Sequence, residues 1–312
     1  MLLKIAQSKI ISVILFLGLL LLCIFYGYSA EPKTETVGWY NWSSNWPQLL
    51  KLIISLASSL SLLLLLKSIA STYRFIQSKT VALEFFYWLF LIALPSSLML
   101  PMNAVASLFS GLMLYVLLQI HNQNSVIGLV FLASLLASVA SMISIYFVAF
   151  YILVIITVLL LRSFNLKNVI VLILGFILPY FYYFGIAYLL NYQIQVKGYQ
   201  FLQIRDLNLN FDLQTLTLST IALISVFSIF YALFKIQKLI VRQRNQIVVI
   251  SLYLLVSIII AILFTPAIMI IPIASAASFF FNLYYQGLNR KWIVDSVILS
   301  IWLMAIWNNY TG

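Results

Sequence analysis

The chain carries little charge for its length of 312 residues. Lys and Arg number 17 and Asp and Glu number 6, so 7% of the residues are charged, whereas 64% are apolar and the mean hydropathy is +1.12. So few polar groups cannot coat a globule in water, which excludes a soluble domain. We therefore expect lipid to be the solvent of most of the chain.

Cysteine and histidine are almost absent. Cys23 is the only cysteine, so no disulfide can form within the chain. His121 is the only histidine, and a metal site would need two or three neighbours of the right type beside it. The nucleotide-binding, zinc-binding and hydrolase motifs GxGxxG, GK[ST], HExxH and GxSxG are also missing. We expect no metal site and no cofactor.

Long apolar runs are abundant instead. A helix needs about 20 apolar residues to cross a hydrocarbon core of about 30 Å, and eleven stretches come close to that length. The predicted helices are 10–30, 48–66, 81–100, 102–120, 126–145, 146–161, 168–190, 214–234, 247–264, 266–286 and 292–307. The sequence therefore predicts an all-α fold, a polytopic transmembrane helical bundle of about 11 helices, with residues 1–312 as a single integral membrane domain.

The basic residues are distributed unevenly over this predicted bundle. With the N-terminus in the cytoplasm, thirteen Lys and Arg fall on the inner side, and only Lys33, Lys51, Lys197 and Arg205 fall outside. The positive-inside rule predicts this asymmetry, and an odd number of helices then puts the C-terminus outside. The net charge of +11 is therefore a topology signal, and we do not interpret it as nucleic-acid binding.

Four of the inner basic residues are concentrated between two predicted helices. They are Lys235, Lys238, Arg242 and Arg244. Such a cluster attracts anionic lipid at about 1 kcal/mol per residue near the membrane surface, although membrane insertion explains it equally well. These residues are candidates for binding lipid headgroups, and the lipid bilayer is the one partner that the sequence itself requires.

Acidic residues inside the predicted helices are few and lie near helix ends. Glu84 lies within reach of Lys79 and Arg74, and Asp295 follows Lys291 by four residues, the spacing of a helical ion pair. No predicted helix carries an acid near its centre, which counts against an ion-coupled pump. We expect both acids to be structural anchors.

The first predicted outer loop carries the candidates for chemistry. Glu31 and Glu35 precede a group of aromatic residues that includes Trp39 and Trp42. Such rings usually form a belt at the membrane interface. The alternative is a stacking platform for a sugar or a lipid headgroup, in which the two tryptophans bind the substrate.

A run of proline and aromatic residues, Pro179–Gly185, lies in the outer half of a predicted helix. Proline removes a backbone donor and bends or ends a helix. The hydroxyls of Tyr180 and Tyr183 then either face a cavity open to the outside or reach the headgroup layer. We treat both tyrosines as candidate substrate-binding residues.

Small residues recur at helical spacing in the predicted helix 126–145. Ala133, Ala137 and Ser141 line one face, and such stripes let helices approach closely in lipid. Similar clusters in the predicted helices 48–66 and 266–286 complete the predicted centre of the bundle. A polar path for a substrate is the alternative interpretation of their hydroxyls.

The order of several short sequence elements between about residues 70 and 190 is distinctive. The most specific are Arg162–Lys167 (RSFNLK) and Leu174–Phe181 (LGFILPYF). In this order the chain resembles a family of uncharacterised Bacteroidota inner-membrane proteins of about this length, from whose loop pattern Ser163, Leu166 and Lys167 depart. The resemblance implies a bacterial inner membrane and a helical fold, and it implies no activity.

A second and vaguer similarity is to polyprenol-dependent glycosyltransferases of the GT-C type. They share many helices and a first outer loop that bears an acid, which in those enzymes acts as a base or a metal ligand. By position Glu31 or Glu35 would have that role, on a polyprenol-linked substrate. The loop of about 17 residues is too short for the juxtamembrane helices usual in those enzymes.

Three classes of function remain open. The first is a non-enzymatic cell-envelope assembly or scaffold component that works through a membrane protein partner, and the missing catalytic motifs favour it. The second is a GT-C-like glycosyltransferase using a lipid-linked sugar, and the third is a lipid transporter or flippase. An outward cavity lined by Glu31 or Glu35 would favour the enzyme, whereas a filled bundle would favour the scaffold.

Overall fold

The computed structural model describes residues 46–73, 82–93, 97–98, 100–120, 126–161, 165–190, 213–236, 241–263 and 266–287, together with Gly18 and Leu21. Within these residues the chain forms nine α-helices and one 3-10 helix, which confirms the all-α fold class. In chain order they are α3 (Gln48–Thr72), α4 (Ala82–Ala93), α5 (Pro101–Gln119), α6 (Ile127–Ile143), η3 (Ile145–Val148), α7 (Ala149–Leu161), α8 (Leu166–Leu189), α9 (Leu213–Ile236), α10 (Val241–Leu263) and α11 (Pro266–Gly287).

The described helices lie where the apolar runs predict them. Four of them, α3, α5, α8 and α10, are long and apolar enough to cross a membrane. α3 ends at Thr72, six residues after its predicted end, and α10 begins at Val241, six residues before its predicted beginning. Both helices extend into polar residues, which lower the hydropathy on which the prediction is based. Of the predicted helix 10–30 the structure describes only Gly18 and Leu21, and the predicted helix 292–307 lies outside the described residues.

The predicted helix 81–100 is wrong in its length. α4 has only 12 residues, which at about 1.5 Å per residue is roughly 18 Å and less than the hydrocarbon core. It ends at Ala93, two residues before Pro95, and a helical residue directly before a proline is disfavoured by a steric clash. Every side chain from Phe86 to Ala93 is buried, so α4 is an internal helix of the bundle.

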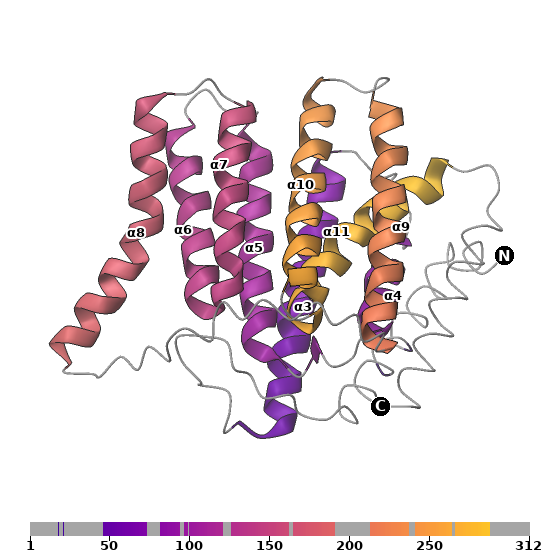
Figure 1. Cartoon of the computed structure of the whole chain (residues 1–312), viewed down its shortest axis with the longest axis horizontal. Helices are drawn as coiled ribbons and strands as arrows, with labels where there is room; N and C mark the ends of the chain where they lie inside the picture. The colour runs from indigo at the N-terminus through magenta and orange to yellow at the C-terminus, as the bar shows by residue number, and fades with distance from the viewer. Residues whose placement is uncertain are drawn as a thin grey trace.

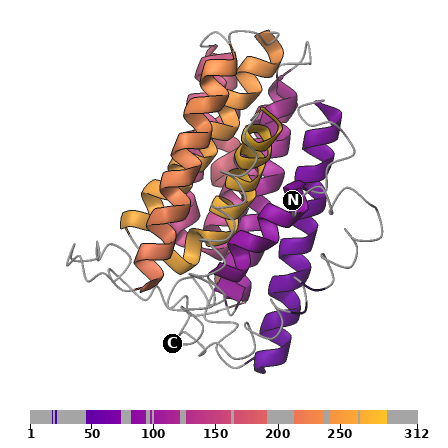
Figure 2. The ribbon, with the colours of Figure 1, turned by 90° about the vertical axis from the view of Figure 1, so that its right-hand side faces the viewer.

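The helices form one bundle in which two groups lie side by side. α5, α6, α7 and α8 lie on one side, and α9, α10 and α11 lie on the other (Figure 1). α6 packs against α5 and α8, while α11 packs against α4, α9 and α10. α3 packs against α5 and lies on the side of the bundle that faces away from α9 (Figure 2).

α11 is the central helix of the second group, through which it runs obliquely (Figure 1). All of its side chains from Met269 to Asn282 are buried. Phe281 packs edge-on against Phe86 of α4, with ring centroids 4.5 Å apart. A helix that is buried on all sides is a core element. The predicted central position of the small residues near the middle of this helix is therefore confirmed.

The stripe of small residues on α6 also lies at the centre of the bundle, as predicted. Ala133, Ala137 and Ser141 are buried. α8 meets this helix at Gly175, where an added Cβ would lie 2.8 Å from the carbonyl oxygen of Phe131. Only glycine permits two backbones to approach this closely, which is the use that membrane proteins make of small residues between helices.

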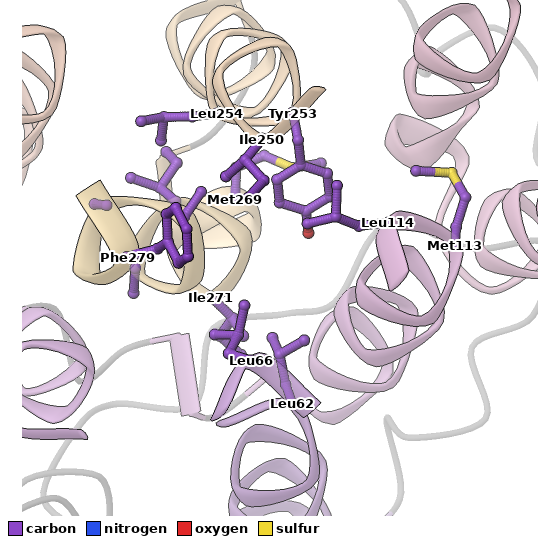
Figure 3. Close-up of a cluster of buried hydrophobic side chains, with 14 of the residues drawn as sticks. Leu62, Leu66, Met113, Leu114, Ile250, Tyr253, Leu254, Met269, Ile271 and Phe279 are labelled. Atoms are coloured by element: carbon purple, nitrogen blue, oxygen red, sulfur yellow. The ribbon is translucent and has the colours of Figure 1, made fainter. Parts of the chain in front are cut away.

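The apolar core joins the two groups of helices. Figure 3 shows Leu62 and Leu66 of α3 and Met113 and Leu114 of α5 around the ring of Tyr253 and its neighbours on α10 and α11. All five of these side chains are buried. The helices α3, α5, α10 and α11 thus share one core.

α8 bends where Pro179 interrupts its backbone hydrogen bonds. Proline has no N–H, so the carbonyl four residues earlier loses its helical partner. Beyond the proline the helix leans away from the bundle (Figure 1), and Tyr188 is 82% exposed. This half of α8 therefore presents aromatic and apolar side chains outward.

Candidate functional site

Most of the residues predicted to bind or convert a substrate lie outside the described residues. These are Glu31, Glu35, Trp39 and Trp42. The structure therefore does not test the outward cavity that the glycosyltransferase hypothesis requires. Of the predicted substrate-binding residues it describes the two tyrosines of α8.

Tyr180 connects α8 to α6. Its hydroxyl lies 2.7 Å from Ser141 Oγ, and one turn earlier Ser138 donates a hydrogen bond of 2.7 Å to the carbonyl of Phe176. Tyr183 packs edge-on against the next ring along the helix, with centroids 5.5 Å apart. Tyr180 therefore contributes to packing between two helices, and substrate binding by either tyrosine stays a prediction.

Lys235 belongs to the last turn of α9, and Arg242 and Arg244 belong to the first turn of α10, at the end of the bundle where α8 also begins (Figure 1), whereas Lys238 lies outside the described residues. Of Lys235, Lys238, Arg242 and Arg244, the structure describes only the side chain of Arg244, which is exposed. Lys167, in the first turn of α8, is also exposed. Lys167, Lys235, Arg242 and Arg244 thus belong to helix ends at one end of the bundle, and the predicted orientation of that end stays a prediction. Their binding to lipid headgroups stays a prediction.

Glu84 pairs with a residue other than the two predicted from the sequence. Lys67 of α3 donates to Glu84 Oε1, whereas Lys79 and Arg74 lie outside the described residues. The side chains are 63% and 20% exposed, respectively, and such an exposed pair contributes at most about 1 kcal/mol. The pair connects α3 to the start of α4, which agrees with the predicted role as an anchor.

Hydroxyl groups meet in the middle of the bundle, where α5, α10 and α11 are in mutual contact. The hydroxyl of Tyr253 on α10 lies 2.8 Å from Ser110 Oγ on α5, and Ser275 of α11 lies beside the same hydroxyl. All three residues are buried, and Figure 3 shows the Tyr253 ring extending from α10 toward α5. Three helices therefore supply one hydroxyl cluster.

Each of these helices also carries a buried amide seven residues from its hydroxyl. The pairs are Asn103 and Ser110 on α5, Gln246 and Tyr253 on α10, and Asn282 and Ser275 on α11. Seven residues are nearly two helical turns, so each amide lies on the same face as its hydroxyl and about 10 Å along the helix. We call these six residues the polar seam.

The amides of the polar seam are buried without a hydrogen-bond partner among the described residues. Asn103 is 5% exposed, Gln246 is 2% exposed and Asn282 is 0% exposed. Both amide atoms of Gln246 and Asn282 lack a partner there, and so does the side-chain oxygen of Asn103. A buried polar group left unsatisfied costs about 1–3 kcal/mol. Each of these amides therefore indicates bound water or a polar ligand.

The amides lie at two depths in the bundle. Gln246 and Asn282 lie on the same side of the hydroxyl cluster, because α10 and α11 are antiparallel, with only two residues between Leu263 and Pro266. Asn103 lies on the opposite side, because α5 runs opposite to α10 (Figure 1). The polar seam therefore extends along the bundle axis rather than around it.

The polar seam is uncharged. Its hydroxyls and amides can donate and accept hydrogen bonds, but they do not supply the acid or base that proton transfer requires near neutral pH. In the part of the chain that the structure describes, no group of three or more His, Cys, Asp or Glu could hold a metal ion. The arrangement suits water or a neutral polar group.

The polar seam was not predicted from the sequence, although part of its signal was present. Asn103 and Asn282 are amides inside predicted helices, and Gln246 directly precedes the predicted helix 247–264. An amide within an apolar run is costly in lipid and is therefore a candidate functional residue. The spacing of seven residues between each amide and the hydroxyl on its helix, however, indicates a shared site only once it is known that α5, α10 and α11 are in contact.

Comparison with known proteins identifies a family. No curated protein and no solved structure matches the chain. A family of unknown function, DUF6427, matches residues 1–307, well beyond the residues 70–190 that carried the predicted resemblance. The chain therefore belongs to DUF6427, a family of unknown function.

Proposed function

We propose that the protein is a non-enzymatic, multi-pass component of the bacterial inner membrane that acts in cell-envelope assembly as a scaffold for a membrane protein partner. The observation that carries this proposal is the filled interior of the described bundle. α11 is buried on every side from Met269 to Asn282, and the apolar core continues from it to α3, α5 and α10. A close-packed interior of this kind resists compression and transmits strain, which suits a rigid support.

The buried hydroxyls support the same proposal. Ser107 donates to the carbonyl of Asn103 at 2.6 Å, and Ser278 donates to that of Ser275 at 2.8 Å. A hydroxyl that bonds to its own helix three or four residues earlier is satisfied without a ligand. Such residues allow close packing and need no substrate.

A lipid transporter or flippase is the second candidate, and the polar seam is the observation that favours it. A headgroup that crosses the bilayer needs hydrogen-bonding groups at more than one depth, because lipid supplies none. Asn103 lies at one depth, and Gln246 and Asn282 lie at another. In a scaffold the same amides would bind enclosed water, which usually makes about three hydrogen bonds.

Complementation of a strain that lacks the gene separates the scaffold from the glycosyltransferase. Glu31→Gln and Glu35→Gln, alone and together, should retain most of the complementation, because loop carboxylates and amides have similar volumes. Loss of a catalytic base would instead lower the rate by about 10²–10⁴. If either variant reaches the membrane at the normal level and fails to complement, the glycosyltransferase becomes the first choice.

Asn282→Leu separates the scaffold from the transporter. In a scaffold the leucine removes a buried amide and keeps the same number and branching of side-chain heavy atoms, so the variant should complement and should be no less abundant than the wild type. Leu254→Asn, which places a new amide in the same core, is the matched control and should lower abundance. A transporter would lose function in Asn282→Leu at unchanged abundance, and that result would reverse our order of preference.

A further inference from the structure

A groove lies between α7 and α8, both of which pack against α6. Its volume is about 190 Å³. Its apolar walls are formed by Ile155, Val158 and Leu159 of α7 and by Val169, Leu172 and Ile173 of α8. The groove therefore lies between two helices that are both packed against α6.

Tyr151 closes the groove at one end. Its ring lies against Phe176 of α8, with centroids 4.0 Å apart, and its hydroxyl lies 3.4 Å from the carbonyl oxygen of Leu172. From Tyr151 to Leu161, where α7 ends, are ten residues, or roughly 15 Å at about 1.5 Å per residue. This length is about half of a hydrocarbon core of about 30 Å. The groove therefore lies within one leaflet.

The contents of the groove follow from its walls and surroundings. Ile152 of α7 is 54% exposed and Ile173 of α8 is 46% exposed, so both helices present apolar side chains to the bilayer beside it. Water would need two to four polar partners, which these walls do not supply. An acyl chain matches the apolar walls, and 190 Å³ holds roughly six groups of the size of a water molecule or methylene, which is part of one acyl chain.

The mouth of the groove is polar. Asn165 and Asn168 lie at the beginning of α8 and line the groove at this end. Lys167 lies between them and is exposed. The chain carries no Asp or Glu from residue 85 to residue 205, so no acid of this region repels an anion. A cation and two amides at the level of the headgroups favour a phosphate.

We propose that the groove between α7 and α8 binds one acyl chain of an anionic phospholipid, with Lys167 and Asn168 at its phosphate group. The bound lipid comes from the leaflet at which α8 begins, which the distribution of basic residues predicts to be the cytoplasmic leaflet. This site is distinct from the basic cluster between α9 and α10. It does not depend on whether the protein is a scaffold or a transporter.

Native mass spectrometry of the purified full-length chain in detergent tests the proposal. Phosphatidylglycerol should bind more tightly than phosphatidylcholine with the same acyl chains. Lys167→Gln should lower this preference by about fivefold, the equivalent of one basic residue near a membrane surface. Equal binding of the two lipids by the wild type would overturn the assignment of an anionic headgroup.

Variants that fill the groove test its acyl-chain site. Val169→Trp fills it from α8, and Ile155→Phe is a smaller change that fills it from α7, should the tryptophan prevent folding. Each folded variant should lose most of its binding of both lipids. Leu174→Trp, on an exposed face of α8 outside the groove, should bind as the wild type does. Unchanged binding in a groove-filling variant, or equal loss in the control, would refute the site.

Discussion

Replacing Gly175 by alanine should force α6 and α8 apart, because the added methyl group has no space. The Cβ would overlap Ser134 Oγ and would lie 2.8 Å from the carbonyl oxygen of Phe131. Ser134 donates a hydrogen bond of 2.9 Å to the same carbonyl, so a rotation of the hydroxyl would break this bond and would still leave the carbonyl in the way. The methyl group can be accommodated only if the two helices separate.

Gly111→Ala is the matched control, because this glycine also lies at a close approach of two helices. Its Cβ would overlap only Leu62 Cδ1, and the Leu62 Cγ atom is 3.7 Å away. A methyl group at the end of a leucine can move by rotation about a side-chain bond, at a cost of about 0.5–1.5 kcal/mol when it leaves its preferred rotamer. No backbone atom has to move.

The expected difference follows from these two geometries. Overpacking a core costs about 1–3 kcal/mol, and alanine is more favourable than glycine inside a helix by about 0.5–1 kcal/mol. Gly175→Ala should therefore lower the free energy of unfolding by about 1–2 kcal/mol. Gly111→Ala should change it by less than about 1 kcal/mol, because the two contributions nearly cancel.

Titration with SDS in mixed micelles, followed by tryptophan fluorescence, measures both free energies of unfolding. Adding Ser134→Ala to Gly175→Ala removes the overlap with the hydroxyl and leaves the overlap with the Phe131 carbonyl, so it should recover only part of the loss. Equal losses for the two glycine variants would refute the reasoning. Full recovery by Ser134→Ala would show that the backbone carbonyl is not the obstacle.

The ion pair and the topology are each open to a direct test. Glu84→Gln should lower the free energy of unfolding by at most about 1 kcal/mol in the same titration, and loss of function at unchanged protein level would mean that this acid belongs to a site. In a variant whose only cysteine is replaced by serine, new cysteines at Ser43 and Asn208 should react with an impermeant thiol reagent in intact cells, and one at Gln243 should not. Labelling at position 243 would overturn the predicted orientation.

The helices were predictable because lipid imposes one strong rule, that every backbone polar group must be satisfied within the segment. The stripe of Ala133, Ala137 and Ser141 was also predictable, since close packing in lipid depends on small residues. Hydropathy was less informative at the helix ends. It missed the first turns of α10, where Arg244 and Gln246 belong to the helix, and it extended α4 beyond Ala93.

Contacts between helices were not predictable from the same rules. The partner of Glu84 is Lys67, 17 residues earlier on another helix, whereas the predicted partners, Lys79 and Arg74, are closer in the sequence. The hydroxyl cluster joins Ser110 to Tyr253 across 143 residues. Apolar helices resemble one another, so composition does not determine which of them pack together. The polar seam became visible only when the structure placed α5, α10 and α11 in contact.

A scaffold and a lipid transporter place different requirements on the polar seam. The Tyr253 hydroxyl lies between the amide of Asn103 and those of Gln246 and Asn282, at 2.8 Å from Ser110 Oγ. The ring of Tyr253 packs against Phe150 of α7, with centroids 4.9 Å apart. A headgroup that passed along the polar seam would have to break the hydroxyl contact and displace this ring, so α5 would have to move relative to α10. Close-packed cores change between discrete arrangements rather than opening gradually. A transporter therefore needs a second conformation with Tyr253 released, whereas a scaffold functions in the single arrangement described.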